Sequence, residues 1–169
     1  MVVLKRSIIL LLVVIFLIGC VATQNEREGE VENTIDKLSP SKTQLKEPPE
    51  LIVRSNDYEV HAVLGTYSWS YDNRDGTSTA IEADSGPPPE LVTEQKNILN
   101  TNLDSEVSLA FDYDPLLIEV YVWNRLAQSR EIAVDDLTFL IDQTGEVVYE
   151  IYAKWNQGNA HYAVEISVD

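Results

Sequence analysis

The sequence contains few of the residues from which catalytic and metal sites are most often built. Among its 169 residues there are one cysteine, Cys20, and two histidines, His61 and His161. A single cysteine forms no disulfide within the chain, so packing alone has to stabilise the fold. The chain also lacks Gly-x-Ser-x-Gly and His-Glu-x-x-His motifs, two common signatures of serine hydrolases and zinc peptidases. The composition therefore argues against an enzyme but leaves the question open.

Basic residues are also scarce. The chain has 12 lysines and arginines against 28 aspartates and glutamates, which gives a formal net charge of −16. Such a negative surface repels nucleic-acid phosphates and anionic lipid headgroups. We therefore expect no nucleic-acid partner, and we interpret the acidity as a source of solubility rather than of cation affinity.

Residues 7–18 form a long apolar run, SIILLLVVIFLI, directly after two basic residues. Its length is typical of a signal peptide, whereas a membrane-spanning helix needs about 20 apolar residues. The run ends in Leu17-Ile18-Gly19-Cys20, which resembles the lipobox of bacterial lipoprotein signal peptides. The resemblance implies export, cleavage before Cys20 and attachment of lipid, such as palmitate, to Cys20. An uncleaved anchor helix is the alternative, since residues 2–4 extend the run.

This resemblance divides the chain into three parts. Residues 1–19 are the predicted lipoprotein signal peptide, and the lipid then holds the protein at the extracytoplasmic face of a cell membrane. Residues 20–50 are rich in Glu, Asn, Thr, Lys and Pro and contain no aromatic residue. Such a segment buries too little apolar surface to offset its ordering entropy, so we predict a flexible acidic tether. Residues 51–169 are the predicted folded domain.

The folded part has the period-two alternation of β-strands. In its first half we expect strands near 51–54, 58–64, 65–71 and 77–83, with a turn at 73–76. Its second half predicts strands near 107–113, 116–123, 137–142, 147–155 and 160–168. Three prolines at 87–89 interrupt the pattern, and we expect a rigid connection between sheets there, followed by one helical turn near 90–95.

Short strands, frequent turn signals and the absence of a long helical pattern fit an all-β domain. We predict an Ig-like antiparallel β-sandwich of about seven to nine strands, with a small barrel as the alternative. The segment WNQGNAHYAVEISV at 155–168 resembles the last two strands of Ig-like domains in secreted bacterial lipoproteins of unassigned function. That resemblance covers the end of the chain and implies no activity.

Three aromatic residues in the first half are a candidate binding site. Tyr67, Trp69 and Tyr71 lie on one face of a predicted strand, where they would form a platform for stacking a sugar or a peptide. Packing of that face into the core explains the same spacing. We favour the core interpretation.

The neighbouring turn is a candidate Ca²⁺ site. Asp72, Asn73 and Asp75, with Asp84 across the hairpin, carry the oxygen ligands that Ca²⁺ prefers. Their spacing departs from that of an EF-hand loop. A β-turn with solvated carboxylates is the favoured interpretation, and we expect no cofactor.

The function expected from the sequence is a membrane-anchored, non-catalytic module that binds a protein, a peptide or a cell-wall component. One alternative is a hydrolase that cleaves an envelope polymer through a pair of carboxylates. Another is a structural or inhibitory module that recognises its partner at a sheet edge. Both histidines alternate with the apolar residues of their strands, so we expect them at solvent-exposed positions.

Overall fold

The computed structural model describes residues 44–124 and 127–169. The described residues belong to one compact unit. The predicted signal peptide, Cys20 and most of the predicted tether lie outside the described residues. In the part of the chain that is described, no helix is long and apolar enough to cross a membrane.

The described residues form eleven strands, one short α-helix and one 3-10 turn. The strands are β1 (Leu51–Ser55), β2 (Tyr58–His61), β3 (Val63–Asp72), β4 (Ser78–Ala83), β5 (Leu99–Thr101), β6 (Glu106–Phe111), β7 (Leu117–Asn124), β8 (Ala127–Ile132), β9 (Thr138–Leu140), β10 (Gly145–Trp155) and β11 (Gly158–Val168). The helix α2 (Pro88–Leu91) and the 3-10 turn η2 (Val92–Glu94) connect β4 to β5. The all-β prediction is confirmed. The strands β5 and β8 are additional to those that the alternation predicts.

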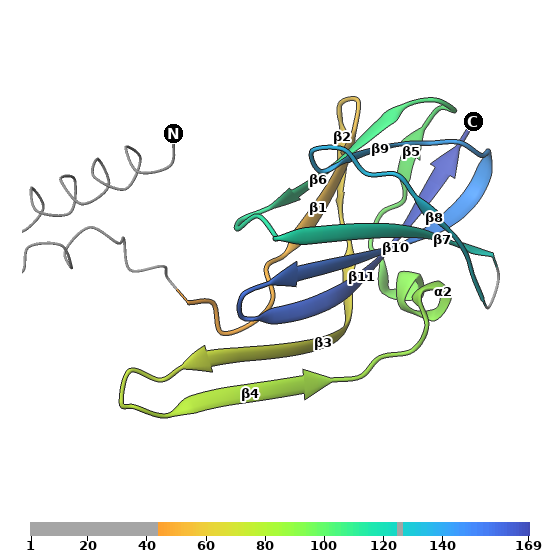
Figure 1. Cartoon of the computed structure of the whole chain (residues 1–169). Coiled ribbons are helices and arrows are strands. Elements are labelled where there is room, and N and C mark those ends of the chain that lie inside the picture. The colour runs from red at the N-terminus through yellow and green to blue at the C-terminus, as the bar shows by residue number, and fades with distance from the viewer. Residues whose placement is uncertain (1–43, 125–126) are drawn as a thin grey trace, which may run out of the picture. The chain divides into compact units, whose positions relative to one another are not determined.

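The strands make two sheets, which form the sandwich seen in Figure 1. The four-stranded sheet has the order β2-β1-β6-β9, and the seven-stranded sheet has the order β4-β3-β11-β10-β7-β8. The remaining strand of the larger sheet, β5, runs parallel to the end of β11. The two longest strands, β10 and β11, pair antiparallel over their full length at the centre of the larger sheet.

The inner faces of the two sheets share one apolar core. Aromatic rings join the sheets across it: Phe111 of β6 packs 5.5 Å from Trp155 of β10, and Phe139 of β9 packs 5.2 Å from Tyr149 of β10. Burying each such side chain contributes about 1.5–3 kcal/mol. The inward-facing residues of β10 are those that the alternation predicts, and none is more than 3% exposed: Val147, Tyr149, Ile151, Ala153 and Trp155.

The folded unit begins earlier than residue 51, the predicted start of the domain. The main-chain oxygen of Leu45 accepts a hydrogen bond from the indole N–H of Trp69 at 2.9 Å. That of Pro49 accepts one from the hydroxyl of Tyr162 at 2.6 Å. The last residues of the predicted tether thus pack on the sandwich.

The proline-rich connection runs over the outer face of the larger sheet. It links β4 to β5, two strands of that same sheet, so the expected connection between sheets is wrong. Pro88 begins α2, where its missing N–H costs nothing, and its side chain is buried. The helix contacts β3, β10 and β11. The helix α2 therefore covers part of the outer face, and a candidate site lies beside it.

Candidate site on the outer face of the seven-stranded sheet

Alternation along β10 and β11 sends a second set of side chains to the outer face. Tyr152 of β10 lies directly opposite His161 of β11, and Glu150 lies opposite Ala163. On the other side of β10, Glu150 lies opposite Tyr121 of β7. The register therefore places a carboxylate at the middle of the outer face with aromatic rings around it.

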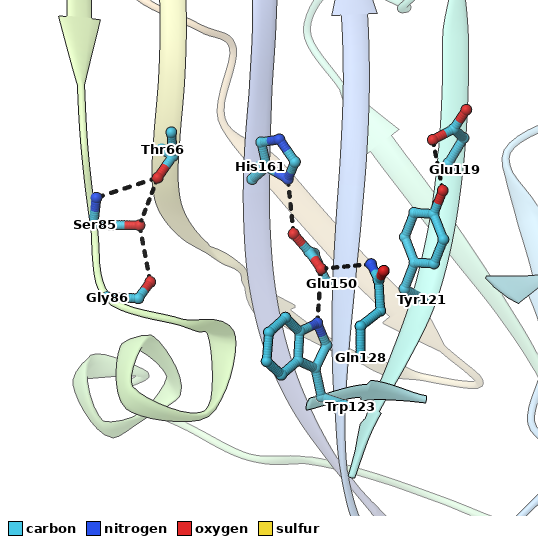
Figure 2. A network of polar contacts seen from close by, with 9 residues as sticks. All are labelled: Thr66, Ser85, Gly86, Glu119, Tyr121, Trp123, Gln128, Glu150 and His161. Atoms are coloured by element: carbon cyan, nitrogen blue, oxygen red, sulfur yellow. Dashed lines mark hydrogen bonds and ion pairs between the residues drawn. The ribbon is translucent and has the colours of Figure 1, made fainter. Parts of the chain in front are cut away.

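Three donors converge on Glu150, as Figure 2 shows. Its Oε2 accepts a hydrogen bond from the indole N–H of Trp123 at 2.7 Å and one from the amide of Gln128 at 3.0 Å. Its Oε1 accepts one from Nδ1 of His161 at 2.7 Å. The glutamate is only 8% exposed. A buried carboxylate needs such partners, because burying it unpaired is costly.

The charge state of Glu150 follows from these contacts. Burial on its own raises the pKa of this carboxyl. The hydrogen bonds from His161, Trp123 and Gln128 lower the pKa by more than burial raises it, so the pKa lies below its usual value. Hydrogen bonds to the charged form favour ionisation. An ionised carboxylate only accepts. Nδ1 of His161 therefore carries a proton, and the tautomer of the imidazole is fixed.

The second ring nitrogen of His161 is available to a ligand. Among the described residues none forms a hydrogen bond with Nε2. The ring packs at 4.9 Å from the ring of Tyr152, and the histidine side chain is 36% exposed. In the neutral ring Nε2 is an acceptor, and in the protonated ring it is a donor. The imidazole is thus held by Glu150 and Tyr152 with one polar atom free.

A cavity of about 260 Å³ opens beside this histidine, between the sheet and α2. Its other lining residues are Thr66, Ser85, Gly86, Pro87, Pro88, Leu91, Glu150 and Tyr162. Gly65 of β3 has no Cβ, which lets two of these lining residues, Leu91 and Ser85, lie close to the strand. A Cβ there would lie 2.8 Å from Cδ1 of Leu91, which is closer than side-chain contacts allow, and 3.1 Å from Oγ of Ser85, which is tighter than most such contacts.

Two hydroxyl groups line the cavity wall across from His161. The hydroxyl oxygens of Thr66 and Ser85 lie 3.1 Å apart, and Ser85 also donates to the main-chain oxygen of Gly86 at 3.0 Å. Figure 2 shows Thr66 on β3, the neighbour of β11, and Ser85 beyond it, just after β4. No hydrogen bond joins Ser85 to His161 within the described residues. The pair is therefore arranged as part of a polar lining and not as a nucleophile with its base.

A further hydrogen bond joins two polar side chains of β7 on the same outer face. The hydroxyl of Tyr121 donates to Oε2 of Glu119 at 2.8 Å. This hydrogen bond, more than burial, raises the pKa of Tyr121 to about 12. We call the whole group the outer-face site; it comprises Thr66, Ser85, Glu119, Tyr121, Trp123, Gln128, Glu150, Tyr152 and His161.

The three residues of the predicted aromatic platform lie apart from the outer-face site. Trp69 is 1% exposed and lies in the core, where its ring packs at 5.5 Å from that of Trp155. Tyr67 and Tyr71 pack against the same core and are partly buried. The three rings therefore do not form an exposed platform, and their position is the one that the core interpretation describes.

The residues of the predicted Ca²⁺ site serve the β3–β4 turn. Asp75 accepts from the main-chain N–H and the hydroxyl of Thr77 at 2.9 and 2.6 Å, and these hydrogen bonds lower the pKa of Asp75. Asp72 and Asn73 bond to side chains of the same hairpin. Asp84 follows the far end of β4, away from the turn. Within the described ranges, no group of three or more His, Cys, Asp or Glu residues is arranged to hold a metal ion.

The two histidines differ in their surroundings. His61 is at an exposed position, as expected, with 66% of its side chain accessible, and its Nδ1 lies 3.5 Å from a carboxylate oxygen of Glu50. His161 is half-buried and bonded to Glu150. A larger hollow of about 570 Å³ lies near His61, between residues 47–50, β2 and residues 94–97. Its polar side chains do not converge as those around Glu150 do.

Glu150 is the central residue among those of the site that the sequence interpretation missed. A signal for it exists in the terminal hairpin. The turn at 156–157 fixes the register, which sets Tyr152 opposite His161 and puts Glu150 two residues further along. Diagonal neighbours on one face of a sheet lie within reach of long side chains. A lone carboxylate between apolar neighbours in a central strand is the pattern to search for.

Comparisons with known proteins add no assignment to this geometry: no protein-family model matches the chain, and no match was found among curated proteins or solved structures. The candidate function therefore depends on the site itself.

Proposed function

We propose that this chain is a lipid-anchored protein of the cell envelope whose Ig-like sandwich binds a glycan, without catalysis, at the outer-face site. The observation that carries the proposal is the buried Glu150, which holds His161 through one hydrogen bond and is itself held by Trp123 and Gln128. The outer face of a sheet needs no buried carboxylate to fold. A rigidly supported polar group at the surface is typical of binding sites.

The chemistry of the cavity favours a ligand rich in hydroxyl groups. The hydroxyls of Thr66 and Ser85 and the free nitrogen of His161 accept and donate hydrogen bonds, while Pro88 and Leu91 supply an apolar wall. Sugars present both kinds of surface. At about 260 Å³ the cavity is slightly smaller than the range of roughly 300–1,000 Å³ typical of small-molecule sites. It suits a single ring of a longer chain, such as a cell-wall glycan.

A carboxylate-dependent hydrolase is less well supported by the same residues. Its general acid would need a raised pKa, whereas the pKa of Glu150 is lowered. Both carboxylate oxygens of Glu150 already accept hydrogen bonds. The glutamate is therefore a positioning residue for His161.

A fluorescence titration tests the glycan proposal. Trp123 is half-buried in the site, whereas Trp69 and Trp155 are 1% and 2% exposed, so a glycan that reaches the site changes mainly the emission of Trp123. We expect oligosaccharides of N-acetylated amino sugars, released from bacterial cell wall, to change this emission in a saturable way. Gly65→Ala would weaken binding by roughly tenfold because its Cβ crowds Leu91 and Ser85.

The matched control is Ser167→Ala. This residue also faces outward from β11 but pairs with Asn100 of β5, at the end away from the cavity. Binding by this variant would equal that of the unchanged protein. No saturable change with the glycan, or equal affinity in Gly65→Ala, would refute the proposed site.

The membrane anchor has its own test. We expect radiolabelled palmitate to enter the protein in bacterial cells and the Cys20→Ala variant to lose both the label and its attachment to membranes. A Cys20→Ala protein that stays membrane-bound would contradict lipidation and favour an uncleaved apolar anchor at residues 7–18.

A further inference from the structure

The two sheets end in edge strands that differ in protection. The edges of the smaller sheet, β2 and β9, have four and three residues. The edge strand β8 shifts its register against β7 and carries Arg130, which binds Asp142. Short length, bulges and charged side chains all discourage pairing with another chain. The fourth edge, β4, is six residues long and continuous in its pairing with β3.

The hydrogen-bonding direction along β4 follows from two contacts. Asn73 donates its main-chain N–H to the main-chain oxygen of Thr77 at 2.9 Å, so the carbonyl group of Thr77 points toward the β3 side of the hairpin. Ser70, which pairs with Ala80, donates its main-chain N–H to Gln157 on the opposite side of β3. Antiparallel pairs alternate between bonded and non-bonded positions. Ala80 and its alternate neighbours, Ser78 and Glu82, therefore direct their N–H and C=O groups away from the sheet.

The side chains leave this edge accessible. The outward-bonding residues Ser78, Ala80 and Glu82 are exposed, and the residues between them are half-buried. No lysine or proline lies in β4, although these are the residues that most often block edge pairing. Within the described ranges no residue bonds to these outward main-chain groups, so the backbone of a partner can approach them directly.

The charge of the hairpin selects the partner. One basic residue, Arg74, stands among four acidic ones: Asp72, Asp75, Glu82 and Asp84. With a net charge of −16 on the whole chain, a second copy of this protein is repelled at the edge. An extended segment with basic side chains is attracted to the same edge.

We infer that β4 is a docking edge for an extended, lysine- or arginine-rich segment of another protein, which adds as a further strand beside Ser78, Ala80 and Glu82. Main-chain hydrogen bonds then supply affinity and the acidic hairpin supplies selectivity, as in other cases of strand addition. This edge is separate from the outer-face site, so a glycan and a peptide would occupy different parts of the protein.

Peptide binding by the full chain in mild detergent tests this inference. The probe is a fluorescein-labelled peptide of alternating lysine and valine, with a glutamate-and-valine peptide as its counterpart. We expect the lysine peptide to bind and to slow deuterium exchange in residues 78–83. Ala80→Pro removes an outward N–H and leaves the pairing with β3 intact, because proline is tolerated on edge strands. It would weaken binding at least about tenfold, whereas Ala80→Ser, which keeps the N–H, would not.

A charge-reversal variant covers the case in which Ala80→Pro does not fold. Glu82→Lys keeps the backbone and is expected to weaken binding of the lysine peptide and to strengthen that of the glutamate peptide. Absence of binding at a peptide concentration of about 1 mM would overturn the inference. Equal affinity in Ala80→Pro and Ala80→Ser would do the same. A dimer of the protein that Ala80→Pro abolishes would assign the edge to a second copy and would also contradict it.

Discussion

The two faces of β10 and β11 are both buried at their centre, but by different means. On the inner face, Tyr149, Ile151 and Val164 are fully buried among apolar side chains of both sheets. On the outer face, Glu150 is 8% exposed and is surrounded by hydrogen-bond donors. An apolar core tolerates the exchange of one apolar side chain for another of similar size and shape. A hydrogen-bonded network depends on each partner, so the outer face specifies the orientation of a few atoms.

This difference separates the roles of the faces. The inner face supplies most of the stability of the sandwich, and we assign binding to the outer face. Substitutions on the two faces should therefore have different signatures in unfolding, in pH dependence and in binding. The predictions below follow in order of decreasing effect on the free energy of unfolding.

The largest loss is expected from the inner-face variant Trp155→Ala. The indole is 2% exposed, packs at 5.5 Å from both Trp69 and Phe111, and donates a hydrogen bond to the main-chain oxygen of Tyr113. Removing a buried tryptophan costs about 3–5 kcal/mol, which urea unfolding measures. A loss below about 1 kcal/mol would mean that this end of the core is not packed as described.

An intermediate loss is expected from Glu150→Gln on the outer face. The amide keeps one acceptor oxygen, but its NH₂ group then faces a donor. Leaving buried donors without an acceptor costs about 1–3 kcal/mol. Urea unfolding at pH 7 measures the difference in stability from the unchanged protein. The matched control is Glu165→Gln, on β11 at the same outer face of the sheet, for which we expect little effect. Equal stability of the Glu150 variant would show that the network contributes nothing to the fold.

The pH dependence of stability tests the same network. Since the fold lowers the pKa of Glu150, its native-state contacts favour the ionised form. Their contribution is complete above the unfolded pKa, near the usual glutamate value of 4.5, and is lost as the pH falls through the lower folded pKa. The stability difference between the unchanged protein and Glu150→Gln should therefore narrow on acidification from pH 7. A stability difference that widens on acidification would contradict a lowered pKa of Glu150 in the folded protein.

A smaller change, and a gain, is expected from Tyr149→Phe on the inner face. The hydroxyl of Tyr149 is buried and has no hydrogen-bond partner among the described residues. Burial, more than the nearby Asp142, raises the pKa of this tyrosine to about 12. Removing an unpaired buried hydroxyl stabilises a fold by up to about 1 kcal/mol. A loss of stability in thermal unfolding would indicate that the hydroxyl finds a partner in solution.

The inner face was predictable from the sequence, and the reason is the period of two. The apolar residues of β10 and β11 alternate without a break, so their direction and pairing follow from the pattern and from the turn at 156–157. Short strands such as β5 have three residues, too few for alternation to distinguish them from a loop. The aromatic run at residues 67–71 shows the limit of the pattern, since the core and a binding platform share one spacing.

The outer-face site was less accessible to prediction. Its central contacts join Trp123, Gln128, Glu150 and His161, which four different strands and their register bring together. A sequence shows that these residues are polar or aromatic, but their meeting depends on β7 and β8 pairing beside β10. The short strand β8, which supplies Gln128, has no alternating apolar pattern of its own.

The most direct test of the account compares two quantities in one variant, His161→Gln. This change removes the free ring nitrogen that faces the ligand, while the glutamine amide still donates to Glu150. We predict that the Kd for cell-wall oligosaccharides rises at least about tenfold, while the free energy of unfolding changes by no more than about 0.5 kcal/mol. An unchanged Kd would contradict the assignment of binding to the outer face. A loss of stability large enough to explain the loss of binding would contradict the separation of roles between the two faces.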